Sequence, residues 1–211
     1  MNMTKRWWLL LLVSLAVIVP FMVPYFTLDP AQSRVEVGTT GWQYPALLAH
    51  IGTAFVALVV GFVQLLEPVR RRRPRLHRLL GRLYAGCVLA SGLLALIVTL
   101  YIADFGKAVS FLALAFLWLL TIWLGVRAAR RKQMDAHRRW MYRSFALTFV
   151  AVSGRLLVPV LLLTYAGLHG FVLPGGREAM VEAVLNVNIW AGLVVNLAVT
   201  EWLVLGRSRR A

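Results

Sequence analysis

Cysteine and acidic residues are scarce in this 211-residue chain, and each scarcity removes a class of function. The single cysteine, Cys87, excludes an intramolecular disulfide and a cluster of cysteine metal ligands. Only 8 Asp and Glu stand against 23 Lys and Arg, and these carboxylates are too scattered to pair for acid–base catalysis. Glycine-rich phosphate loops, the G-x-S-x-G elbow and the H-E-x-x-H zinc motif are also missing. The sequence therefore carries no signature of a hydrolase or a nucleotide-binding enzyme.

Hydrophobic residues, in contrast, make up 60% of the chain, charged residues only 15%, and the mean hydropathy is +0.74. A helix needs about 20 apolar residues to cross a bilayer, and six runs reach that length: residues 7–26, 44–67, 81–103, 108–126, 144–167 and 184–205. A closed barrel would instead show short alternating segments. We therefore predict an all-α integral membrane protein, in which one transmembrane domain over residues 1–211 is a bundle of six helices.

Lys and Arg gather at one end of this predicted bundle. Two precede the first run, seven lie between the second and third, seven between the fourth and fifth, and three follow the sixth, which is 19 of the 23. This positive-inside bias predicts that both termini are cytoplasmic and that the chain crosses a bacterial inner membrane several times. We expect the cations to contact anionic lipid headgroups and not nucleic acid. The first run, interrupted by Pro20 and Pro24, favours a retained anchor over a cleaved signal peptide.

Several polar side chains lie within the predicted spans, where such groups are costly and become candidates for function. Arg155 falls near the middle of the fifth run, and a guanidinium stays charged in proteins. Asn188 and Asn196 share one face of the sixth run. Together with His50 and Tyr165, these residues predict a pocket near the outer face for a lipid or an anionic small molecule. The alternative is that Arg155 is a packing residue hydrated from the outer side.

Two of the four histidines, His77 and His137, stand at the start of the third and fifth helices. Those helices run in the same direction, so both imidazoles are expected at the same depth, near the cytoplasmic face. Neutral imidazole is a common ligand of metals and of haem iron, and two such helices could hold one iron between them. The alternative is that both are solvated residues at the headgroup interface, and His169 is expected to be a loop residue.

Two segments carry a resemblance to known proteins: residues 72–84 read RRPRLHRLLGRLY, and residues 136–148 read AHRRWMYRSFALT. With His50, they resemble a family of bacterial predicted membrane proteins that has no assigned activity, over about residues 44–200. The string His-Arg-Arg-Trp-Met-x-Arg-Ser is a fairly specific signature of that resemblance. It supports the membrane fold and implies no chemistry.

In helix number and histidine placement, the chain also resembles, more distantly, the ascorbate-reducible transmembrane cytochrome b proteins. That resemblance implies one b-type haem with His77 and His137 as iron ligands, and with the nearby Arg82 and Arg143 pairing with its propionates. The fourth run, residues 108–126, contains no histidine, so His50 lacks a partner for a second, outer haem.

Three functions remain as hypotheses. The first is membrane electron transfer through a b-type haem or a quinone, to or from a redox partner protein. The second is a non-catalytic accessory or assembly role. The third is binding of a lipid or an anionic small molecule in the outer pocket. The sequence leaves open whether the chain is an enzyme.

Overall fold

The computed structural model describes residues 3–33 and 41–208, and all regular structure in them is helical. Among the 23 Lys and Arg, Arg34, Arg209 and Arg210 lie outside the described residues. The helices are α1 (Met3–Met22), α2 (Gln43–Gln64), α3 (Glu67–Arg72), α4 (Pro74–Thr99), α5 (Phe105–Arg130), α6 (Met134–Thr148), α7 (Val150–Leu168) and α8 (Gly176–Ser208). Two short 3₁₀ segments, η1 (Val23–Thr27) and η2 (Pro30–Gln32), follow α1.

Six of the described helical segments are long and apolar enough to cross a membrane: Lys5–Thr27, Gln43–Gln64, Pro74–Thr99, Phe105–Arg130, Val150–Leu168 and Gly176–Val204. The predicted all-α membrane protein with six spans is thereby confirmed. Many large apolar side chains point outward along these helices, as expected where lipid and not water surrounds a protein.

Local capping sets helix ends that differ from the limits of the apolar runs. Pro74 lies in the first turn of α4, where its missing N–H costs nothing, so α4 begins before residue 81. The Asp104 carboxylate accepts a hydrogen bond from the Lys107 backbone N–H at 2.6 Å, which starts α5 at Phe105. The second run stops at Gln64, and the separate helix α3 follows, with Pro68 in its first turn.

The fifth apolar run, expected as one helix over residues 144–167, is instead divided between α6 and α7, which meet at Phe149. The Thr148 hydroxyl donates to the Ser144 carbonyl at 3.0 Å, a back-bond of the kind that bends helices. The two halves also have different neighbours, because α6 packs mainly on α5 whereas α7 packs mainly on α8. The division therefore reflects tertiary packing as well as local hydrogen bonding.

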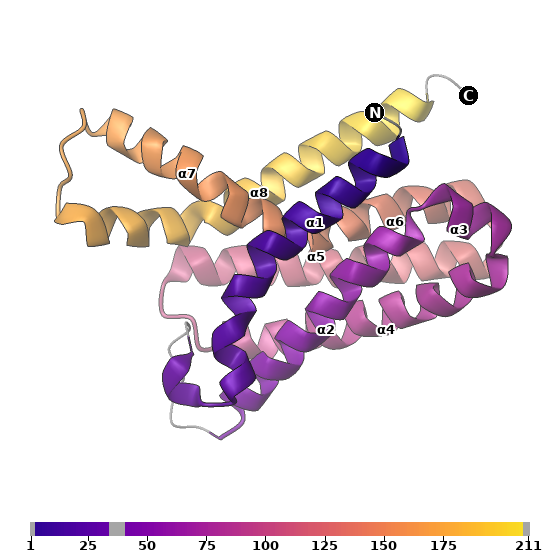
Figure 1. Ribbon diagram of the computed structural model, residues 1–211, viewed down its shortest axis with the longest axis horizontal. Helices are drawn as coiled ribbons and strands as arrows, with labels where there is room; N and C mark the ends of the chain where they lie inside the picture. The colour runs from indigo at the N-terminus through magenta and orange to yellow at the C-terminus, as the bar shows by residue number, and fades with distance from the viewer. Residues whose placement is uncertain (1–2, 34–40, 209–211) are drawn as a thin grey trace.

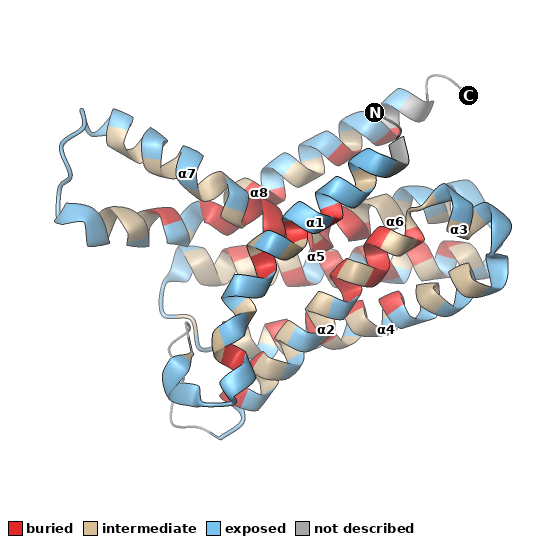
Figure 2. Ribbon diagram, in the orientation of Figure 1, coloured by how far each residue is buried: buried red, intermediate tan, exposed pale blue. Residues whose placement is uncertain are grey.

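The bundle centres on α2, α4, α5 and α6, with α1 crossing in front of them in the view of Figure 1. The buried core residues include Tyr84, Val88, Trp118, Leu147 and Val150. Figure 2 shows the buried positions concentrated where these helices meet α8. Helix α7 and the first half of α8 project beyond the bundle as a hairpin (Figure 1).

One end of the molecule gathers the start of α1, all of α3, the turn between α5 and α6, and the end of α8 (Figure 1). We call it the basic end, because the arginine-rich segments 70–78 and 127–139 lie there. The two segments predicted to share one side of the membrane thus lie at the same end of the structure.

Candidate functional site

The structure places His77 and His137 at the same end of the bundle, the basic end. Both are half-buried, His77 in the first turns of α4 and His137 in the first turns of α6. The Tyr84 hydroxyl of α4 lies 3.0 Å from Ser144 Oγ of α6, and each histidine lies seven residues before one of these two residues, so both imidazoles lie at the same level of the bundle. The histidine pair is therefore a feature of the tertiary structure as well as of the sequence.

Contacts with two further helices set the position of each histidine. The Gln64 side-chain amide, at the end of α2, donates to the His77 backbone carbonyl at 2.8 Å. His137 Nδ1 lies 2.8 Å from the Gly125 carbonyl of α5. A Cβ on Gly125 would stand 2.8 Å from Met141 Sδ, so glycine allows α5 and α6 to approach this closely.

The Nδ1 atoms of the two histidines differ in their hydrogen bonding. His137 Nδ1 makes its contact with the Gly125 carbonyl as a donor, because a carbonyl oxygen only accepts. His77 Nδ1 is buried and has no hydrogen-bond partner in the described part of the chain. A buried polar atom without a partner costs about 1–3 kcal/mol, and such atoms mark candidate ligand sites.

The two arginines expected beside a cofactor are in different situations. Arg82 is exposed on α4. Arg143 on α6 instead binds Glu201 on α8, through Nε at 2.5 Å and Nη2 at 2.8 Å, and its guanidinium lies 4.7 Å from the centroid of Trp140. Hydrogen bonding to Glu201 raises the pKa of Arg143 further above its ordinary value, so this cation keeps its proton.

Sequence reasoning missed this ion pair, which joins α6 to α8. The only signal was an acidic residue, Glu201, close to the basic end of the last helix. We expect Glu201→Gln to lower the free energy of unfolding by about 1–2 kcal/mol, because Arg143 then keeps a charge without its bidentate partner. This expected loss of unfolding free energy is smaller than for a fully buried ion pair, because the Glu201 side chain is 39% exposed. Thermal unfolding in detergent measures the change.

Glu67→Gln is the matched control for this substitution. Glu67 pairs with Arg71 at 2.8 Å, but both side chains are largely exposed, and such a pair contributes less than about 1 kcal/mol. If both glutamine variants unfolded at the temperature of the unsubstituted protein, the Arg143–Glu201 pair would not hold α6 to α8.

The residues predicted to line an outer pocket have separate neighbours. His50 on α2 contacts α4, where its Nδ1 lies 3.0 Å from Ser91 Oγ and 2.9 Å from the Ser91 carbonyl. Arg155 donates through Nη1 to the Ala151 carbonyl at 2.6 Å, and its guanidinium lies 4.6 Å from the centroid of Phe21. The Arg155 guanidinium thus contacts a backbone carbonyl of its own helix and an aromatic ring of α1.

The other members of that predicted pocket lie along α7 and α8. Tyr165 stacks on His169 with ring centroids 4.1 Å apart, towards the tip of the projecting hairpin. Asn188 is buried where α7 crosses α8, and its carbonyl lies 3.2 Å from the position of a Cβ on Gly154. Asn196 donates to the Ala146 carbonyl at 2.8 Å.

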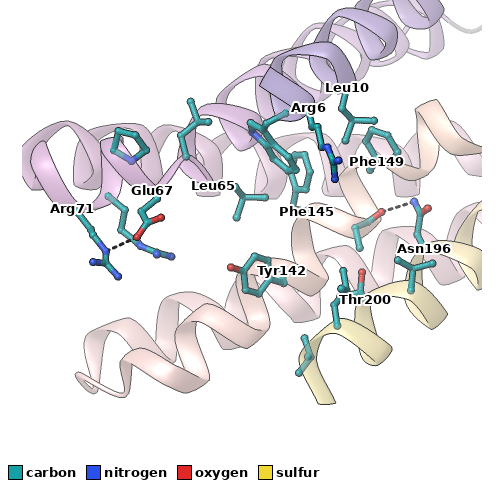
Figure 3. A pocket seen from close by; sticks show the side chains of 18 of the residues that line it. Arg6, Leu10, Leu65, Glu67, Arg71, Tyr142, Phe145, Phe149, Asn196 and Thr200 are labelled. Carbon is teal, nitrogen blue, oxygen red and sulfur yellow. Dashed lines mark hydrogen bonds and ion pairs between the residues drawn. The ribbon is translucent and has the colours of Figure 1, made fainter. Parts of the chain in front are cut away.

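A cavity of about 1060 Å³ opens at the basic end among α1, α3, α6 and α8 (Figure 3). Of the five residues predicted to form a pocket, Asn196 alone lines this cavity. Its other walls come from residues that the sequence analysis did not select, including Trp7, Phe145 and Phe149. These side chains are ordinary apolar residues in the sequence, and only the packing of four separate helices brings them around one space.

Comparison with known proteins identifies the family. A family model described as predicted membrane protein (DUF2306) matches residues 47–204. The chain belongs to this family. The DUF2306 match runs from α2 to α8, and so includes the histidine pair and three of the four walls of the cavity, whereas α1 precedes it. The resemblance to a family of predicted membrane proteins is thereby confirmed, while the likeness to cytochrome b proteins stays a prediction. No curated protein and no solved structure matches the chain.

Proposed function

We propose that this DUF2306 protein transfers electrons within the membrane, with one b-type haem held between His77 and His137. The observation that carries the proposal is that both imidazoles lie in the first turns of their helices at the basic end, seven residues before the Tyr84–Ser144 contact that joins α4 to α6. Two parallel helices that each offer an imidazole at the same depth are suited to ligate one iron from both sides.

The chain's own residues fit such a ligand in two respects. The Gly125 carbonyl orients the His137 ring and fixes its tautomer, which is the outer-shell contact typical of a metal-bound histidine. A ligand would also relieve the buried, unpartnered nitrogen of His77. When bound, haem would supply a one-electron couple. The exposed Arg82 is available to a propionate, whereas Arg143 already uses two of its nitrogens on Glu201.

The same proposal includes a membrane orientation. The basic end would face the cytoplasm of a bacterial inner membrane, with both chain termini on that side, because short arginine-rich loops favour the cytoplasmic face. Electrons would then be exchanged at this face with a quinone or a partner protein. The common location of α3 and the α5–α6 turn at one end supports this orientation.

Absorption spectroscopy tests the haem. We expect the protein, expressed with ample haem supply and purified in detergent, to show a Soret band and an α-band that sharpens with dithionite. His77→Ala and His137→Ala should each reduce the haem content at least about tenfold, since each removes an iron ligand. His169→Ala is the matched control, because that imidazole is exposed and stacks on Tyr165.

Two results would contradict the proposal. One is a colourless protein after expression with ample haem. The other is an equal loss of absorbance in the His77, His137 and His169 variants, because that outcome would report general misfolding instead of lost ligation.

A further inference from the structure

Positive charge dominates the rim of the cavity at the basic end. Arg6 from α1 and Arg70, Arg71 and Arg72 from α3 line it, while Glu67 is the one carboxylate in its described lining. Four arginines and one glutamate leave a net of three positive charges. Glu67 is already paired with Arg71, so no carboxylate of the lining is left to neutralise the other three arginines. The rim is therefore suited to an anion.

Below the rim, the cavity has apolar and aromatic walls. Trp7 and Leu10 contribute from α1, Phe145 from α6, Phe149 from the junction of α6 and α7, and Leu203 from α8. Figure 3 shows Leu10, Phe145 and Phe149 around the same space as the polar residues of α8. The chemistry of this wall suits a hydrocarbon chain.

The tryptophan of this wall is held in place. The Trp7 indole N–H donates to the Phe62 carbonyl at 2.8 Å, which ties α1 to α2. Its ring lies 5.1 Å from the Phe62 ring and 6.0 Å from the Phe145 ring, centroid to centroid. The aromatic side of the cavity is therefore pre-formed, and a ligand would not have to order it.

Two residues of the cavity lining are also exposed on the outside of the bundle. Leu10 on α1 is 36% exposed and Leu203 on α8 is 50% exposed, although both line the cavity. Both helices are membrane-spanning segments. The apolar lining of the cavity therefore includes side chains that surrounding lipid can contact directly.

We propose that this cavity binds one anionic phospholipid from the surrounding leaflet, with its phosphate at Arg6, Arg70 and Arg72 and an acyl chain along the apolar walls. Arginine binds phosphate through paired N–H donors, and anionic lipids are drawn to basic clusters at a membrane surface. A soluble anion would satisfy the rim but leave the apolar walls uncovered. The volume of about 1060 Å³ suits a headgroup and part of a chain, since small-molecule sites measure about 300–1,000 Å³. Neither His77 nor His137 lines this cavity, and the lipid proposal does not depend on haem.

Native mass spectrometry of the full chain tests the site. The protein is reconstituted in nanodiscs of equal parts phosphatidylglycerol and phosphatidylethanolamine, released, and weighed with its retained lipid. We expect one retained phosphatidylglycerol, favoured about tenfold over phosphatidylethanolamine, the ratio that corresponds to one charge-assisted interaction. The double variant Arg6→Gln/Arg72→Gln should bring that ratio close to one.

Two further variants separate the site from general effects. Arg130→Gln/Arg131→Gln also removes two exposed cations of the basic end, but both lie outside the cavity lining, so the preference should persist. Val199→Trp places a large ring in the cavity wall and should abolish retention of both lipids. This second route keeps the test decisive even if the Arg6/Arg72 variant folds poorly, which size-exclusion chromatography and circular dichroism would reveal.

Several outcomes would overturn the proposal. These are equal retention of the two lipids by the unsubstituted protein, retention of a quinone or a free fatty acid in place of a phospholipid, no retained lipid, or an equal loss of preference in both double-arginine variants. Undiminished retention by Val199→Trp would place the lipid elsewhere on the protein surface.

Discussion

Gly192→Leu is expected to force α7 away from α8 and to lower the free energy of unfolding by about 3 kcal/mol, the upper end for overpacking. A Cβ on Gly192 would stand 3.0 Å from the Gly154 backbone nitrogen, 3.1 Å from Ser153 Oγ and 3.2 Å from Gly154 Cα. Two of these three atoms belong to a helix backbone and cannot rotate aside. Small residues allow such close crossings between membrane helices.

Gly86→Leu is the matched control, because a Cβ at that position of α4 meets nothing within 4 Å. Both substitutions gain about 1 kcal/mol of helix propensity relative to glycine, so their difference reports the contact with α7. A loss of about 3 kcal/mol corresponds to a Tm about 6–12 °C lower for a chain of this size. Equal melting temperatures for the two leucine variants would show that α7 and α8 do not cross this closely.

Thr148→Val is expected to cost about 2–3 kcal/mol, although it replaces one β-branched side chain by another of nearly the same shape. The Thr148 hydroxyl accepts the Trp118 indole N–H at 2.9 Å and lies 2.8 Å from the Tyr84 hydroxyl. Valine would leave the indole N–H buried without an acceptor, and such a group costs about 1–3 kcal/mol. Tyr84 would retain its contact with Ser144 Oγ at 3.0 Å.

The control for this variant is Thr164→Val on α7. The Thr164 hydroxyl is exposed and, within the described residues, bonds the Val160 carbonyl of its own helix at 2.9 Å, so little change is expected. Chemical or thermal unfolding followed by tryptophan emission compares the two valine variants. If they were equally stable, the hydrogen bonds among α4, α5 and α6 would not contribute to the stability of the bundle.

This buried network also concerns the candidate site, because it joins the helices that begin with the two histidines. Tyr84 lies on α4, two turns after His77, while Ser144 and Thr148 lie on α6, beyond His137. The network is closed by Trp118 of α5. The network therefore holds α4 and α6 in register inside the bundle. Thr148→Val should also weaken the binding of any ligand that bridges His77 and His137.

The sequence by itself determined that the chain is helical and crosses the membrane six times. Lipid offers no hydrogen bonds to the backbone, so each crossing must be a helix of about 20 apolar residues, and such runs are visible without any tertiary information. It also selected His77 and His137 as a pair, because alternating helix directions place the starts of the third and fifth spans at one end.

Helix ends and interhelical contacts were decided only by the tertiary structure. Apolar runs report where the chain lies in lipid, whereas α4 begins at Pro74 within a basic segment and α6 begins at Met134 within another. The break at Phe149 arises because α6 and α7 pack against different helices. The Arg143–Glu201 pair joins residues 58 positions apart, and the cavity draws its walls from α1, α3, α6 and α8. Such features depend on how helices rotate and cross, and a pattern of hydrophobicity along one helix does not specify which helix its polar face will meet.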